Sequence, residues 1–128
     1  MMPSLQAWWH AVFWVALMIA AWAALRPIAA EEWFSGQDKV LHLATYTGLY
    51  LSGRLAFHDA LWRLPVALLA YGVAIELLQS LTPSRTMSFA DVVANTLGLA
   101  LGILLLGMVQ RRWPQLWMAM SQSETGCR

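Results

Sequence analysis

Four apolar segments, each close to the length that crosses a lipid bilayer, constrain this chain more than any other feature. A membrane-spanning helix needs about 20 predominantly apolar residues. The four segments are residues 5–25, 40–57, 62–81 and 88–109. The last three carry Arg54, Glu76 and Asp91, and the connections between segments are short. Short connections make consecutive helices antiparallel neighbours. The sequence therefore predicts an all-α integral membrane protein, a compact antiparallel bundle of four transmembrane helices.

The composition supports this fold class and excludes others. Of the 128 residues, 59% are hydrophobic and only 12% are charged, against about 25% charged residues in a typical soluble domain. A formal net charge of +1 provides no basic surface for nucleic acid. Cys127 is the one cysteine of the sequence, which excludes an internal disulfide and a cysteine-based metal site. We expect a single membrane domain over residues 1–128, with a short cytoplasmic tail at 110–128.

Lysine and arginine near the helix ends favour one orientation of the bundle. With four crossings, one side holds both termini and Arg54, Arg63, Arg111, Arg112 and Arg128. The other side holds Arg26, Lys39 and Arg85. Trp8, Trp9, Trp62, Trp113 and Trp117 fall on the side with five arginines, as an interfacial belt would. We therefore predict cytoplasmic termini, with loops 26–39 and 82–87 outside. Segment 5–25 is longer than the apolar region of a signal peptide and has no basic residue before it, so we expect a retained helix.

Polar side chains recur at helical spacing in three of the segments and form three stripes. Charged residues inside a membrane are costly and usually mark a site. The stripes are Asp38, His42 and Tyr46 with Lys39 beside them; Gly72, Glu76 and Gln79; and Asp91, Asn95, Gly98 and Gly102. At 1.5 Å per residue, Glu76 lies roughly 8 Å inside the outer end of its helix. Because consecutive helices are antiparallel, the stripes should converge at one depth, next to Arg85 and Ser88.

Each polar feature also has a purely structural interpretation. Ser35 to Asp38 and Ser88 to Asp91 fit the capping box that begins a helix. His42 can be a core histidine bonded to one carboxylate. Gly98 and Gly102 favour close helix packing, within the chain or in a homodimer. Glu76 needs a cation or a proton at its depth, and Arg85 or Lys39 can form its salt bridge.

These residues together resemble the VanZ-like family. The motifs that carry the resemblance lie in residues 38–102: Asp38-Lys-x-x-His42-x-x-x-Tyr46, then Tyr71-Gly72-x-x-x-Glu76-x-x-Gln79, then Pro83-x-Arg85-x-x-Ser88-x-x-Asp91-x-x-x-Asn95-x-x-Gly98-x-x-x-Gly102. The family consists of small bacterial membrane proteins and is named after a member associated with teicoplanin resistance. The resemblance therefore implies a multi-pass protein of the bacterial cytoplasmic (inner) membrane, and it implies no particular reaction.

Three functions fit the predicted polar cluster. The first, which we favour from the sequence, is a pocket that binds an anionic lipid head group, such as a lipid-linked phosphate, through Arg85, Lys39 and Ser88, with no metal and no cofactor. The second is a membrane enzyme in which His42 or Glu76 acts as general base; a metal-dependent version would use Asp38, His42, Glu76 and Asp91 with Mg or Mn. The third is a structural or assembly subunit, in which the cluster only joins helices.

Overall fold

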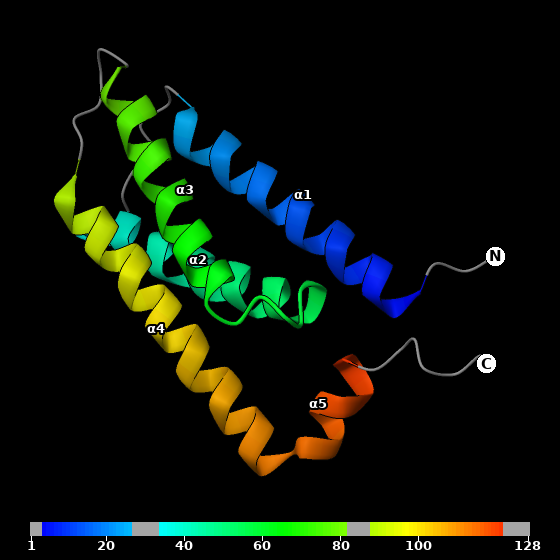
Figure 1. Ribbon diagram of the computed structural model, residues 1–128. Coiled ribbons are helices and arrows are strands. Elements are labelled where there is room, and N and C mark those ends of the chain that lie inside the picture. Colours follow the sequence, from blue (N-terminus) through cyan, green and yellow to red (C-terminus); the bar gives the residue numbers. More distant parts are fainter. Residues whose placement is uncertain (1–3, 27–33, 82–87, 122–128) are drawn as a thin grey trace.

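The computed structural model describes residues 4–26, 34–81 and 88–121, and helices dominate these ranges (Figure 1). The helices are α1 (Leu5–Leu25), α2 (Gln37–Ala56), α3 (Arg63–Ser80), α4 (Phe89–Arg112) and α5 (Pro114–Ser121). The described part of the chain contains no strand. The predicted all-α class is therefore confirmed.

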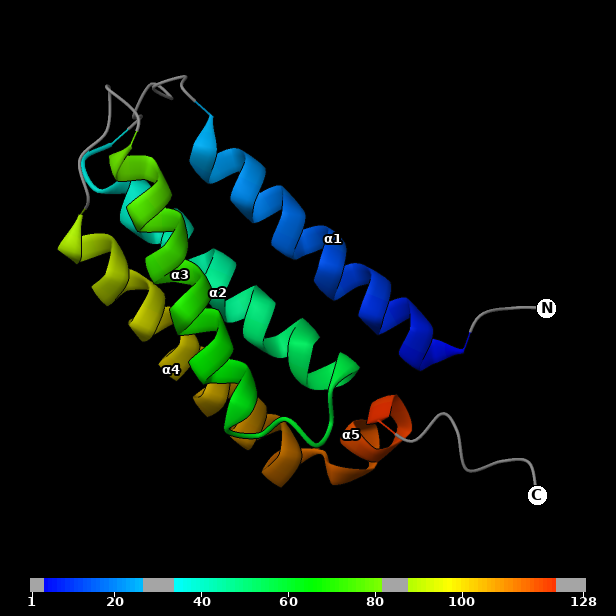
Figure 2. The same cartoon turned by 45° about the horizontal axis from the view of Figure 1, so that its top comes forward.

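The four long helices run alternately up and down the bundle. The end of α1, the start of α2, the end of α3 and the start of α4 lie at one end of the molecule (Figures 1 and 2). We refer to this end as the upper end and to the opposite one as the lower end. α2 packs against α1, α3 and α4, so it is the central helix. Its residues Leu49 and Tyr50 are among the most buried of the chain and join the core formed with Leu68 and Leu99.

Two glycines allow α4 to approach α2 closely. A Cβ atom at Gly98 would collide with the backbone oxygen of Leu43, and one at Gly102 would lie 2.9 Å from Cδ1 of Tyr50. The Thr47 hydroxyl donates a hydrogen bond to the Gly98 carbonyl at 2.9 Å, across the same contact. Close packing within the chain explains both glycines, and a homodimer through them stays a prediction.

The helix boundaries agree with the predicted segments, but the count of four spans is not confirmed. α1 has the predicted bounds, and the others differ from the prediction by at most three residues at either end. Among the described residues, three helices are long and apolar enough to cross a membrane: α1, α3 and α4. α2 falls short because, as the central helix, it carries polar and charged side chains such as Asp38, His42 and Arg54.

Two local predictions were wrong. α2 begins after Gly36, which has a φ of 86°, and no side chain caps this helix, so Ser35 and Asp38 do not form a capping box. Ser88 does precede α4, but its hydroxyl makes no capping hydrogen bond. The predicted tail 110–128 also contains α5. This helix has an apolar face, but it is too short to be predicted as a membrane span.

We predict that Gly98→Ala lowers the free energy of unfolding by about 1–3 kcal/mol, because the new methyl group meets backbone that cannot move aside. Gly107→Ala is the matched control in the same helix, since nothing lies within 4 Å of the added Cβ. The control should be neutral or stabilising by about 0.5–1 kcal/mol. Thermal unfolding in detergent measures both, and equal effects of the two variants would contradict the close α2–α4 contact.

Candidate functional site

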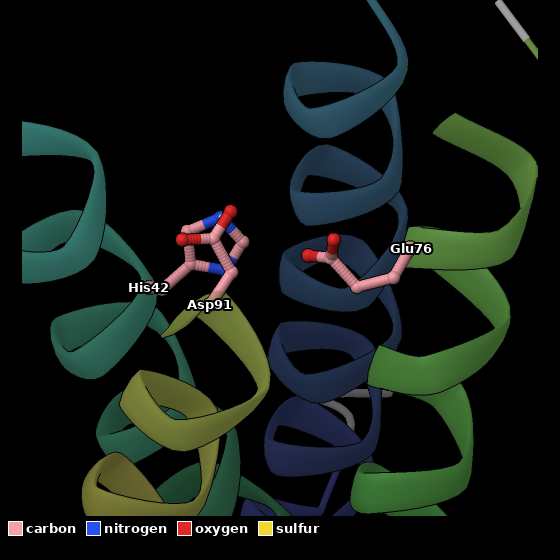
Figure 3. A group of neighbouring side chains, drawn as sticks. All are labelled: His42, Glu76 and Asp91. Carbon is pink, nitrogen blue, oxygen red and sulfur yellow. The ribbon is translucent and has the colours of Figure 1, made fainter. Parts of the chain in front are cut away.

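Three side chains from three helices meet near the upper end of the bundle. They are His42 of α2, Glu76 of α3 and Asp91 of α4, and each offers a ligand atom within 4.8 Å of the other two (Figure 3). Glu76 extends from α3 toward the neighbouring pair (Figure 3). We call these three residues the carboxylate–histidine cluster. Its position follows from the antiparallel order, which brings the early residues of α2 and α4 to the level of the late residues of α3.

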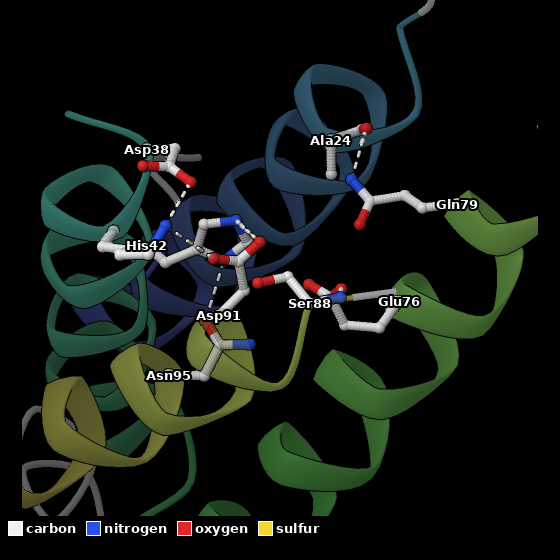
Figure 4. A network of polar contacts seen from close by, with 9 residues as sticks. Ala24, Asp38, His42, Glu76, Gln79, Ser88, Asp91 and Asn95 are labelled. Carbon is white, nitrogen blue, oxygen red and sulfur yellow. Dashed lines mark hydrogen bonds and ion pairs between the residues drawn. The ribbon is translucent and has the colours of Figure 1, made fainter. Parts of the chain in front are cut away.

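His42 is held by two residues of α4. Its Nδ1 lies 2.9 Å from Oδ1 of Asn95 (Figure 4). The Asn95 amide oxygen accepts this hydrogen bond when Nδ1 carries a proton. Nε2 of the same ring lies 3.8 Å from Oδ2 of Asp91. A lone pair and a carboxylate oxygen repel one another unless a proton or a cation lies between them. The geometry thus favours a positive charge at this point.

Asp38 and Lys39 lie at the rim of the cluster. Nζ of Lys39 is 2.8 Å from Oδ2 of Asp38 and 3.7 Å from Oδ1 of Asp91. The Lys39 side chain is 46% exposed and that of Asp91 is 13% exposed, so the ion pairs lead from the surface inward. Asp38 precedes the predicted span 40–57, and its hydrogen bond from Lys39 lowers its pKa below the usual value. Asp38 is therefore engaged with Lys39 and stands apart from the cluster.

Glu76 is the most deeply buried of the three cluster residues, with 1% of its surface exposed. Its Oε2 accepts a hydrogen bond of 3.3 Å from the backbone N–H of Ser88, the residue before α4 (Figure 4). A carboxylate at a helix N-terminus is stabilised by the free N–H groups and by the helix dipole. Glu76 therefore occupies the anion-binding end of α4 and joins α3 to α4. Of the two salt-bridge partners predicted for Glu76, Arg85 lies outside the described residues, and the ion pairs of Lys39 given above are with Asp38 and Asp91.

Gln79 and Tyr71 tie α3 to α1. Nε2 of Gln79 donates to the Ala24 carbonyl at 2.7 Å (Figure 4), and the Tyr71 hydroxyl donates to the Leu17 carbonyl at 2.7 Å. Side chains that bond across helices satisfy polar groups inside a bilayer. Gln79 thus joins α3 to the α1 wall of the site.

A cavity of about 460 Å³ opens beside the cluster. Its polar lining includes Arg26, Asp38, His42, Tyr46, Glu76, Gln79 and Asn95. The Gly72 backbone makes room here, because a Cβ on it would lie 2.6 Å from the Tyr46 hydroxyl and 2.9 Å from Nδ2 of Asn95. The sequence analysis missed the α1 wall, formed by Ala20, Ala23 and Ala24. The spacing of these small residues on one helical face was the signal that could have revealed it.

A family model, VanZ/LLP1, matches residues 2–110. The chain belongs to the VanZ/LLP1 family. The resemblance seen in residues 38–102 is thereby confirmed, and the match also includes α1, which forms one wall of the cavity. Comparison with curated proteins and with solved structures gives no match.

The VanZ/LLP1 chain offers a donor set that suits a divalent cation. Two carboxylates and one imidazole match the preferences of Mn²⁺, Mg²⁺ and related ions. The sequence analysis assigned no metal and gave four ligands, including Asp38, to its metal-dependent alternative. The structure brings three of these four together and leaves Asp38 at the rim. Asn95 supplies the second contact that orients a metal-binding histidine.

We predict that Mn²⁺ raises the melting temperature of the purified VanZ/LLP1 protein. A ligand that binds only the folded chain stabilises it by about 2.7 kcal/mol at 100 times its Kd. Asp91→Asn and His42→Ala should abolish the shift, because each removes a cluster ligand. Asp38→Asn is the matched control and should keep the shift. Thermal unfolding in detergent, with and without a chelator, measures the effect; a shift that survives loss of His42 would place the cation elsewhere.

Proposed function

We propose that this VanZ/LLP1 protein is a divalent-cation-dependent membrane enzyme that binds a lipid-linked phosphate in the cavity and hydrolyses its phosphate ester or, in a diphosphate, the anhydride bond between the two phosphates. The observation that carries the proposal is the cluster of His42, Glu76 and Asp91, whose ligand atoms lie within 4.8 Å of one another. The sequence favoured a pocket that binds an anionic head group without a metal. The charges of the observed site favour a cation-dependent site instead.

A phosphate without a counter-ion fits the observed cavity poorly. Glu76 already lies at the N-terminus of α4, where it accepts from the Ser88 N–H, and its negative charge would repel a second anion there. Lys39 is paired with Asp38 and Asp91. A phosphate placed beside the carboxylates of the cluster would be repelled at short range. A divalent cation bound to the cluster reverses this charge and attracts phosphate.

The depth of the cluster suits the head group of a lipid. Glu76 lies four residues before the end of α3 and His42 five residues after the start of α2, which places both about 6–8 Å below the helix ends. The ends of long apolar helices lie near the membrane interface, where lipid phosphates are found. A substrate anchored by its chain in the bilayer could thus present its phosphate to the cavity.

The residues of the site have distinct roles in the proposed reaction. His42, Glu76 and Asp91 would hold the cation, which would supply Lewis-acid chemistry to the phosphate. Asn95 contacts Nδ1 of His42 and so orients the ring with Nε2 toward Asp91. Hydrolysis consumes one water and breaks one P–O bond. A lipid monophosphate yields inorganic phosphate and the lipid alcohol, and a lipid diphosphate yields inorganic phosphate and the lipid monophosphate.

The second candidate is binding without turnover. Arg26 in the cavity lining favours it, since it is a cation that can attract a phosphate head group. In this version the cation cluster would only orient the ligand. Both candidates have a lipid-linked phosphate as ligand, and such lipids carry precursors of the cell envelope. A contribution to teicoplanin resistance is therefore part of either proposal.

We predict phosphate release from a polyprenyl diphosphate in detergent micelles when Mn²⁺ or Mg²⁺ is present. Chelation should abolish release, and Asp91→Asn should reduce kcat at least 100-fold, in line with the loss of a group that organises the reacting centre. Asp38→Asn controls for the loss of a nearby negative charge and should retain most of the activity. Substrate that binds without any phosphate release would favour the second candidate, and release that is insensitive to chelation would contradict the cation.

The predicted orientation, with both termini in the cytoplasm of a bacterial inner membrane, places the cavity toward the outside. We expect a cysteine at Ser35, which is exposed near the start of α2, to react with an impermeant thiol reagent in intact cells. A cysteine at Gln115 in α5 is the matched control and should react only after permeabilisation. Both variants carry Cys127→Ser. The reverse labelling pattern would invert the orientation.

A further inference from the structure

A second site candidate lies at the lower end of the bundle, away from the cavity. Arg54 is in the last turn of α2 and is only 5% exposed. Its Nε and Nη1 are buried, and neither has a hydrogen-bond partner among the residues that the structure describes. A guanidinium stays charged at all ordinary pH values, so Arg54 cannot escape the cost of burial by losing a proton.

The buried Arg54 guanidinium needs a hydrogen-bond acceptor from outside the described residues. Taking a cation out of water costs several kcal/mol unless an anion and hydrogen bonds compensate it. The Gly53 carbonyl near Arg54 is already bonded to the Phe57 N–H. The dipole of α2 favours a cation in the last turn, but a dipole alone leaves the N–H groups without acceptors.

Other nitrogen atoms at the same end share this condition. Nε1 of Trp9, in the first turns of α1, and Nε2 of His58, just after α2, are also buried without a hydrogen-bond partner in the described part. The His58 ring lies 6.3 Å from the Trp117 ring of α5. α5 turns back from the end of α4 toward the side on which α1 begins (Figure 2). The lower end therefore gathers several buried nitrogen atoms that have no hydrogen-bond partner among the described residues.

The surroundings of Arg54 match the membrane interface. Trp8, Trp62 and Trp113 expose 57–77% of their surfaces at this end, as residues of an aromatic belt do. Arg63, Arg111 and Arg112 are exposed there, against one described acid, Asp59. Such an excess of positive charge attracts anionic lipids.

We propose that Arg54 binds the phosphate of an anionic phospholipid from the leaflet at the lower end. The guanidinium would form charge-assisted hydrogen bonds to the phosphate oxygens, for which its planar fork is suited. The basic residues around it select a lipid with net negative charge over a zwitterionic one. This site is separate from the cavity and does not depend on the proposed reaction.

The test uses the full-length protein in maltoside detergent, titrated with phosphatidylglycerol. Bound lipid is measured by native mass spectrometry and by the rise in melting temperature. We expect the wild type to bind phosphatidylglycerol more tightly than phosphatidylcholine. Arg54→Gln should weaken the binding of phosphatidylglycerol about 10-fold or more, because it removes charge-assisted hydrogen bonds. Arg63→Gln removes an exposed charge at the same end without touching the buried guanidinium, so it measures the loss of general attraction alone and should weaken binding clearly less than Arg54→Gln.

Arg54→Lys keeps the cation but loses the fork, so we expect binding between that of the wild type and Arg54→Gln. If Arg54→Gln does not fold, Arg54→Lys is compared with the wild type in its place. Equal binding by the Arg54 and Arg63 variants would overturn the site. An equal rise in melting temperature with inorganic phosphate in place of lipid would overturn the lipid assignment.

Discussion

The close contact between α2 and α4 is the constraint on which the rest of the structure depends. Gly98 and Gly102 remove the side chains that would hold the two helices apart. At this separation the Asn95 amide reaches the His42 ring at 2.9 Å, and Asp91 comes within 3.8 Å of the same ring. A wider spacing would break both contacts. Helix packing by small residues therefore sets the geometry of the polar cluster directly.

A bundle in a membrane must satisfy its inward-facing polar groups without help from water. α2 meets this requirement by packing against α1, α3 and α4. Its polar residues Ser52 and Arg54 are buried in the bundle, while Val40 and Leu41 are exposed. Gln79 and Tyr71 answer it differently, by bonding to backbone carbonyls of α1. These bonds hold the thin alanine wall of the cavity against α3.

Sequence periodicity was sufficient to predict α1 and the approximate bounds of the other long helices, since each has a long apolar run. It also placed His42, Glu76 and Asp91 at one level, because antiparallel order and helical rise determine depth. It could not reveal that Ser88 would donate its backbone N–H to Glu76, since no side-chain identity encodes that contact. The separation of Asp38 from the cluster was also hidden, because Asp38 and His42 share a helical face and only the ion pair with Lys39 distinguishes them.

The two ends of the bundle differ in charge, and this difference links the two proposed sites. At the upper end the described carboxylates of Asp38, Glu76 and Asp91 crowd around one imidazole and one lysine, an arrangement that a divalent cation would stabilise. At the lower end a buried arginine lies among exposed ones with a single described acid nearby, an arrangement that phosphate would stabilise. Phospholipid head groups at the lower end would anchor the helices there. The cluster at the upper end would then sit at a fixed depth, about one helical turn below the level at which a lipid-linked phosphate enters.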